Sequence, residues 1–240
     1  MPFTLAHPAA VLLFRRFCPQ KLSFPALVVG SVAPDLGYWS GPFDLERISH
    51  GFVGGFWFDL PLALLMLIVI YLLRTPIARL LPVGIRDLWF AMWPRQIGTP
   101  LSVLLSLLLG IWTHLLWDTF THNHGWLVEN VNPLQAPLFH FHHRNFRVSH
   151  LISYACSVVG VAILIAAATK WREQSLSSGT RAFTKTERWK LFWIACLVLP
   201  ITAIHHLFPS LPGLCVVAGL SFLMIAAVAK VLAEGRMSPV

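Results

Sequence analysis

Residues 101–126 read LSVLLSLLLGIWTHLLWDTFTHNHGW, an apolar segment that ends in side chains of the kind that bind metal ions. Leu101 to Trp117 carries no charge, and His114 is its one strongly polar residue. The segment therefore predicts a membrane helix slightly shorter than the usual span of about 20 residues. Residues four apart lie on one face of a helix, so His114 and Asp118 share a face, and His122 continues it if the helix persists.

This spacing supports two interpretations. An imidazole and a carboxylate on one helix face can bind a divalent metal ion. A charged side chain in hydrocarbon costs at least about 2.5 to 3.5 kcal/mol unless it is paired, coordinated or hydrated, so Asp118 requires a partner. Alternatively, Asp118 marks the point where the helix leaves the membrane, and His114 is hydrogen-bonded inside a helical bundle. The spacing alone does not separate the two.

The composition is that of a polytopic membrane protein. Of 240 residues, 56% are hydrophobic and 12% are charged, and the mean hydropathy is +0.68. The net charge of +8 is not gathered into a basic stretch with interleaved aromatic residues, which argues against nucleic-acid binding. The cysteines have no C-x-x-C spacing, so neither a disulfide framework nor a thiolate zinc site is expected.

The hydrophobic segments predict an all-α, polytopic membrane protein with about five transmembrane helices plus an N-terminal helical hairpin. We expect residues 74–100 to lie at the membrane interface and residues 122–150 to form a loop rich in histidine and proline. The whole chain, 1–240, is expected to be a single integral membrane domain, with a motif-bearing half at 1–130 and the histidine-rich loop and further helices at 131–240. The expected spans are Phe56–Leu73, the helix at 101–117, Leu151–Thr169, Leu191–Ile204 and Leu211–Ala233.

Basic residues gather in alternate loops, at 74–95, at 170–190 and in the C-terminal tail. Loops rich in lysine and arginine stay on the cytoplasmic side of a membrane. The opposite, external side would then carry nearly all the potential ligands: Asp35, His50, Asp118, His122, the histidine-rich loop and His205.

The N-terminal region needs a separate explanation. Its sequence, MPFTLAHPAAVLLFRRF, does not resemble a cleaved signal peptide, so we expect the mature chain to start near Met1. Pro8 to Phe17 and Leu22 to Ala33 are both too short for an ordinary span. If they pack as an antiparallel hairpin, His7 and Asp35 return to the same level.

Four segments carry a family resemblance. They are MPFTLAHPAAVL, LSFPALVVGSVAPD, SHGFVGGFWFDLPLALL and THLLWDTFTHNHGWLVE. They resemble the bacterial membrane proteins grouped as domain-of-unknown-function family 4184, over Met1 to about Glu129. This resemblance implies a multi-pass protein of the bacterial inner (plasma) membrane, and the positions of the basic loops predict that the candidate site lies on its external face.

The motif order is also similar to that of membrane-bound proteins described as metal-dependent hydrolases. Those proteins have an N-terminal histidine, a Pro-Asp after a helix, a histidine-containing turn and a His-x-x-x-Asp helix. The matching positions imply a set of metal ligands. The turn departs from the hydrolase pattern, because Ser49-His50-Gly51 stands where that group has a denser HR-x-x-x-HS. The implied ligands are His7, Asp35, His50, His114 and Asp118.

Three histidines and two aspartates suit Zn, with Mn or Fe as alternatives, better than Ca or Mg. A water bound to such an ion has its pKa lowered toward about 7 and can hydrolyse an ester or phosphate ester. His122 is then the candidate catalytic acid or base. The expected partners are the lipid bilayer and an amphiphilic substrate at the membrane surface, and no residue identifies that substrate or the oligomeric state.

Two other functions remain open. The first is a metal-binding structural or assembly protein without enzymatic activity. The second is a cation transporter, suggested by Asp59 and Pro61 near the start of a span, although its ligands would have to lie at mid-depth in the membrane. The remaining polar residues have simpler explanations: solvated or interfacial positions for His124, His140, His142 and His143, a helix end for His205 and His206, and helix caps or bundle partners for Asp59 and Glu129.

Overall fold

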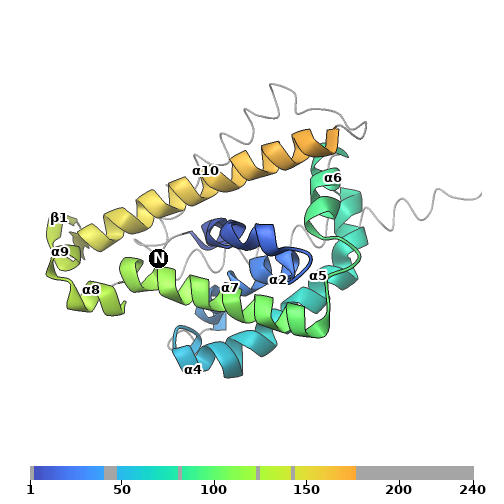
Figure 1. Ribbon diagram of the computed structural model, residues 1–240. Helices are drawn as coiled ribbons and strands as arrows, with labels where there is room; N and C mark the ends of the chain where they lie inside the picture. The colour runs from blue at the N-terminus through green and yellow to red at the C-terminus, as the bar shows by residue number, and fades with distance from the viewer. Residues whose placement is uncertain (1–2, 41–47, 81–82, 123–124, 142–143, 177–240) are drawn as a thin grey trace, which may run out of the picture.

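The computed structural model describes residues 3–40, 48–80, 83–122, 125–141 and 144–176, and these are mostly helical (Figure 1). Three helical segments are long and apolar enough to cross a membrane: Phe52–Arg79, Pro100–Asn130 and Val148–Trp171. They correspond to three of the expected spans. The two others, Leu191–Ile204 and Leu211–Ala233, lie outside the described residues.

Helix α7, Pro100–Thr121, is the central element. Pro100 stands at its first position, and the Thr99 side chain accepts a hydrogen bond from the Ser102 backbone N–H, so the helix begins with a conventional N-cap. At the other end, the backbone N–H of His122 donates to Asp118 O. The helix therefore continues four residues past Trp117, far enough to place Asp118 in its last turn.

Helix α2, Phe24–Gly30, packs closely on α7. Two glycines allow this approach: a Cβ at Gly30 would overlap the carbonyl oxygen of Leu107, and a Cβ at Gly110 would overlap that of Leu27. Near the same crossing, the Ser23 N–H donates to Ser106 Oγ over 2.8 Å. Small residues at such crossings allow helix backbones to pack without side chains between them.

The chain before α2 folds as three short helical turns, η1 (Thr4–Ala6), α1 (Pro8–Val11) and η2 (Leu12–Phe17). These turns pack between α7 and α10 (Figure 1). Two contacts attach them to α10: Phe3 N–H donates to Ser157 Oγ over 2.6 Å, and the Arg15 guanidinium lies 3.5 Å from the centre of the Trp171 ring. The N-terminus is thereby held inside the helical assembly.

Residues 52–80 and 83–92 form a further group of packed helices. Helix α4 (Phe52–Gly54), the π-helical turn η4 (Gly55–Asp59) and α5 (Leu60–Leu80) follow one another without a break, and α6 (Val83–Met92) then packs against α5. The Trp89 side chain donates to Arg74 O over 3.0 Å. Helix α5 continues to Leu80, so the first residues of the expected interface-lying segment at 74–100 belong to the same helix as the candidate span.

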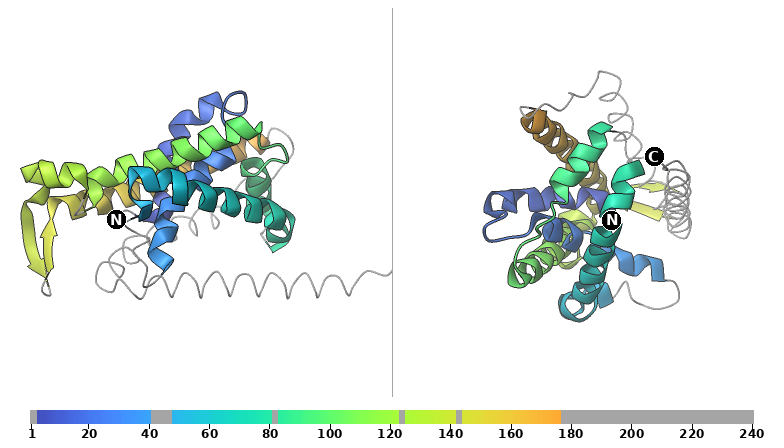
Figure 2. Two further views of the ribbon diagram at one scale, coloured as in Figure 1. Left: turned by 90° about the horizontal axis from the view of Figure 1, so that it is seen from below. Right: turned by 90° about the vertical axis from the view of Figure 1, so that its right-hand side faces the viewer.

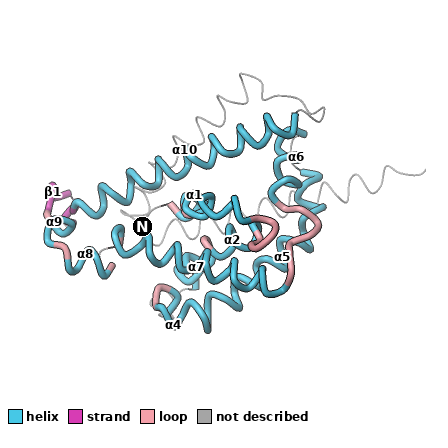
Figure 3. The backbone as a smooth tube through the Cα atoms, viewed as in Figure 1, coloured by secondary structure: helices cyan, strands magenta, loops and turns pink. Residues whose placement is uncertain are grey.

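The structure is mostly helical, as expected, but it corrects the expectation of a loop at 122–150. Helices α8 (Trp126–Asn130) and α9 (Asn132–Gln135) lead into an antiparallel pair, β1 (Pro137–Phe141) and β2 (Arg144–Arg147). Phe139 pairs with Phe146, and their rings stack 4.7 Å apart, the kind of cross-strand contact that stabilises a hairpin. The hairpin extends from one end of the helices (Figures 2 and 3). Helix α10, Val148–Leu176, follows it.

Candidate metal centre

The last two turns of α7 carry His114 and Asp118 on one face, and His122 follows as the residue that ends the helix. Asp118 Oδ2 lies 3.0 Å from His114 Nε2 and 3.3 Å from His122 Nδ1. The shared face predicted from the four-residue spacing is therefore present, and the Asp118 carboxylate lies between the two imidazoles.

Two further side chains reach this face from the segments that follow α2. Asp35 lies in the 3-10 turn η3 (Ala33–Ser40), and His50 follows a helical turn at residues 48–49. Asp35 Oδ1 is 3.5 Å from His114 Nε2, and His50 Nε2 is 3.4 Å from Asp118 Oδ2. One ligand atom from each of Asp35, His50, His114 and Asp118 falls within 4.8 Å of the others, so the four form a group that could hold a metal ion.

His7 lies against the same group. Its ring stacks on His114 with 3.7 Å between the ring centres, and its Nε2 is 3.9 Å from Asp118 Oδ1. The short turns at the N-terminus bring His7 to the level of Asp35, which is the arrangement expected of the N-terminal hairpin. The centre therefore collects side chains from the N-terminus, from both sides of residues 41–47 and from α7.

Hydrogen bonds orient these side chains. His114 Nδ1 lies 2.8 Å from the backbone oxygen of Ser31. A carbonyl oxygen only accepts, so Nδ1 carries a proton. Nε2 is thereby directed at the carboxylates, toward which it points an N–H when the ring is protonated and a metal-binding lone pair when the ring is neutral. Asp118 Oδ1 accepts from Thr121 Oγ1 over 3.3 Å, and Ser49 Oγ lies 3.1 Å from His50 Nδ1. The sequence motifs did not single out Ser31 and Thr121, because neither carries a recognisable metal-binding pattern.

The carboxylates are buried, with Asp35 2% and Asp118 4% exposed. In the part of the chain that the structure describes, their ion-pair partners are all histidines. Both oxygens of Asp35, together with His114 Nε2 and Asp118 Oδ2, lack a hydrogen bond of acceptable geometry there. Buried polar atoms of this kind are normally satisfied, and a divalent cation among them would compensate two negative charges.

The pKa values of centre residues outside the candidate spans show how the charges of histidines and carboxylates depend on one another. Burial lowers the pKa of the His7 imidazole to about 3, so this ring is neutral at pH 7. Burial by itself would raise the pKa of Asp35, but the neighbouring His114 outweighs it and holds that pKa below its usual value. Burial would likewise lower the pKa of His50, yet the neighbouring Asp118 carboxylate, 3.4 Å from His50 Nε2, raises it. Protons on histidines thus balance the carboxylates, and a metal ion would displace them.

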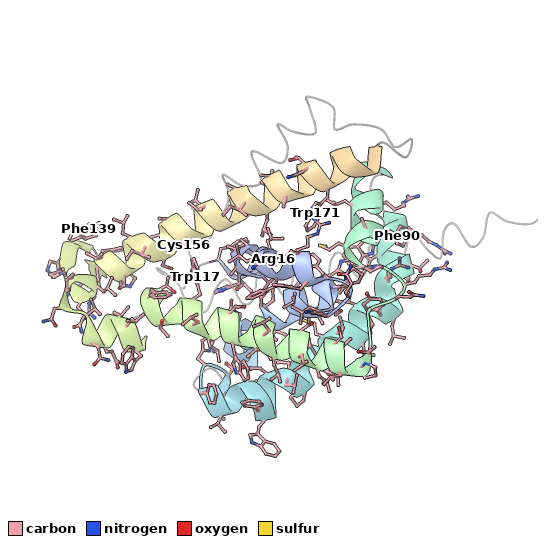
Figure 4. All side chains as sticks on the ribbon, viewed as in Figure 1. Arg16, Phe90, Trp117, Phe139, Cys156 and Trp171 are labelled. Atoms are coloured by element: carbon pink, nitrogen blue, oxygen red, sulfur yellow. The ribbon has the colours of Figure 1, made fainter. Side chains whose placement is uncertain are left out.

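Other candidate residues fall elsewhere. His140 lies in strand β1, away from the centre, while His124, His142, His143, His205 and His206 lie outside the described residues. Asp59 is fully buried in η4, and among the described residues neither carboxylate oxygen has a hydrogen-bond partner, so its role as a cap or bundle partner stays a prediction. Figure 4 shows Trp117 and Cys156 between α7 and α10, where their side chains interact. This contact positions α10 against the turn of α7 that carries Asp118.

The fold and this cluster define a helical protein with three candidate membrane-spanning helices and a candidate metal centre at the end of one of them. Residues 1–235 match the family described as Domain of unknown function (DUF4184), and the chain belongs to this family. The match extends well past Glu129, where the recognisable motifs end. No curated protein and no solved structure is detectably similar to the chain.

Proposed function

We propose that this chain is an integral membrane protein that binds a divalent metal ion and hydrolyses an ester or phosphate ester at the membrane surface. The observation that carries the proposal is the group of four ligand atoms, from Asp35, His50, His114 and Asp118, within 4.8 Å of one another. Two aspartates and two histidines, joined by the stacked His7, form a mixed nitrogen and oxygen set. Such a set favours Zn, with Mn or Fe as alternatives.

The membrane environment follows from the outer surfaces of the helices. Large apolar side chains are exposed along α5, α7 and α10, including Leu65, Leu72, Leu105, Leu151 and Val159. Contact between these apolar surfaces and water would have a large free-energy cost, whereas in a membrane lipid would cover them. Together with the positions of the basic loops, this supports a multi-pass protein of the bacterial inner membrane with the centre at the external face.

The residues of the centre divide into two roles. Asp35, His50, His114, Asp118 and His7 would hold the ion, which supplies a water-derived nucleophile and polarises a substrate oxygen at neutral pH. His122 lies beside Asp118 with its side chain 21% exposed, so it can exchange protons with solvent. That position suits a general acid or base that transfers a proton to or from the reacting group.

A second function is favoured by one observation. The side chains of Asp35, His114 and Asp118 are at most 5% exposed. Structural metal sites are closed, whereas catalytic sites leave one position open to substrate. A metal-binding structural or assembly protein would share the centre and lack turnover, so bound metal and activity have to be measured on the same preparations.

The test is elemental analysis of the purified chain beside Asp118→Ala and His114→Ala, with Glu129→Ala as a matched acidic control on the exposed turn of α8. We expect the wild type and the control to retain the ion and both centre variants to lose it. Equal metal content in the wild type and Asp118→Ala would contradict the centre. Metal retained without turnover of any ester or phosphate ester would instead favour the structural role.

A further inference from the structure

The candidate centre is closed around Asp35, His114 and Asp118 and partly exposed on the side of His50 and His122. The His50 and His122 side chains are 16% and 21% exposed, while those of Asp35, His114 and Asp118 are at most 5% exposed. The rings of His50 and His122 lie 5.3 Å apart, centre to centre. A molecule that reaches the centre therefore passes these two histidines.

Phe52, two residues after His50, belongs to a group of three aromatic side chains. We call this group the aromatic platform: Phe52, Phe56 and Trp112. The Phe52 and Trp112 rings are nearly parallel, 9° apart in plane, at 5.8 Å. Phe56 stands edge-on to Trp112 at 5.3 Å. Phe52 is 68% and Phe56 38% exposed, so the platform presents apolar surface that no described residue covers.

The platform and the partly exposed side of the centre adjoin. Two residues of extended chain span at most about 7 Å, so Phe52 stays within that distance of His50 along the backbone. A candidate membrane span also begins at Phe52. Gly55, in the turn between Phe52 and Asp59, packs on the side chains of Ile111 and Trp112, which attaches the platform to α7. The polar centre thus lies at the end of a span, beside an apolar surface.

We infer that the aromatic platform binds the hydrocarbon chain of a single-chain amphiphile whose anionic head group reaches the metal centre past His50. This inference rests on the proposed metal-binding function and narrows the expected amphiphilic substrate to one with a single hydrocarbon chain and an anionic head group. The chemistry is complementary, because a divalent ion held in the centre can also coordinate an oxygen of an anionic head group. The apolar chain then lies along Phe52 and Phe56 toward the hydrocarbon of the membrane. Contact with these aromatic rings buries the chain away from water, which stabilises the complex.

Decyl phosphate and inorganic phosphate provide the test, because they share a head group and differ in the chain. Both are titrated into the zinc-loaded full-length protein in phosphatidylcholine nanodiscs. The variant is Phe52→Ser, and the matched control is Leu72→Ser, which removes a side chain that is 72% exposed on the same helical run. Twenty residues of helix place Leu72 about 30 Å from Phe52. Both positions are exposed, so neither change is expected to disturb folding.

Phe52→Ser should bind decyl phosphate about tenfold more weakly than the wild type and bind inorganic phosphate equally well. Leu72→Ser should match the wild type with both ligands. Unchanged decyl phosphate binding in Phe52→Ser, or an equal loss in Leu72→Ser, would overturn the platform and leave the metal centre standing. Absence of zinc from the wild-type protein would overturn the proposed function and this inference together.

Discussion

The rings of His7 and His114 stack 3.7 Å apart, although one residue lies in the first turns of the chain and the other in the last part of α7. This contact joins the N-terminus to the carboxylates of the centre, since His114 Nε2 lies within 3.5 Å of both Asp35 and Asp118. The N-terminal turns are themselves fixed by the hydrogen bond from Phe3 to Ser157 in α10. The geometry of the centre therefore depends on α10 as well as on α7.

His7→Phe separates stacking from coordination. Phenylalanine keeps an aromatic ring against His114 but removes Nε2, so we expect zinc affinity to fall at least about tenfold while the thermal unfolding temperature stays close to that of the wild type. Competition with a chelator of known affinity measures the first quantity, and a melting curve of the metal-free protein measures the second. Unchanged zinc affinity would show that His7 supports the centre only by packing.

His122→Ala tests the catalytic assignment. Because His122 ends α7 and its side chain is partly exposed, its removal should leave zinc content unchanged. Turnover of an ester or phosphate ester should fall about 100- to 10,000-fold, the usual contribution of a general acid or base. Assays of bound metal and of the initial rate on the same preparations test both expectations. Loss of zinc together with activity would reassign His122 as a ligand.

Gly110→Val tests the helix crossing beneath the centre. A side chain at Gly110 would meet Leu27 O and Ser31 N, so α2 has to move away from α7. Overpacking of this kind costs about 1 to 3 kcal/mol, and here it also displaces Ser31, whose carbonyl orients His114. We expect lower stability in denaturant and weaker zinc binding than in Gly160→Ala, a smaller change within α10 that faces Ala6. A variant that melts and binds zinc like the wild type would contradict close packing at this crossing.

Asp59→Leu tests the buried carboxyl group of η4. A buried polar group without a hydrogen-bond partner costs about 1 to 3 kcal/mol, so its replacement by an apolar side chain should raise the free energy of unfolding by a similar amount. Unfolding by denaturant, followed by tryptophan fluorescence, gives this value. If the variant is less stable or holds less zinc, Asp59 contributes to the centre, and cation transport through this span regains support.

Leu138→Cys tests the orientation in the membrane. Leu138 is 49% exposed in strand β1, within the hairpin that follows the end of α7 carrying the centre. In a background with the native cysteines replaced by serine or alanine, a membrane-impermeant maleimide should label this position from the external side of intact cells. A cysteine at Lys170 should be labelled only after the cells are opened. The reverse pattern would place the centre on the cytoplasmic side.

The sequence by itself determined the apolar helices and the shared face of His114 and Asp118, because both follow from short-range order. Apolar segment length decides whether a helix can cross a bilayer, and 3.6 residues per turn place residues four apart on one face. Motif resemblance also nominated His7, Asp35 and His50, which the structure brings to the same cluster; their roles as ligands remain predictions.

Only the tertiary structure decided how those residues meet. The glycine crossing of α2 on α7, the stacking of His7 on His114 and the orientation of His114 by Ser31 all join segments far apart in the chain. The β-hairpin and the burial of Asp59, whose carboxylate has no hydrogen-bond partner among the described residues, also escaped prediction. Local spacing determines which face of a helix a side chain occupies. The partners of that side chain depend on how closely other backbones approach the face, and packing across the whole assembly sets this distance.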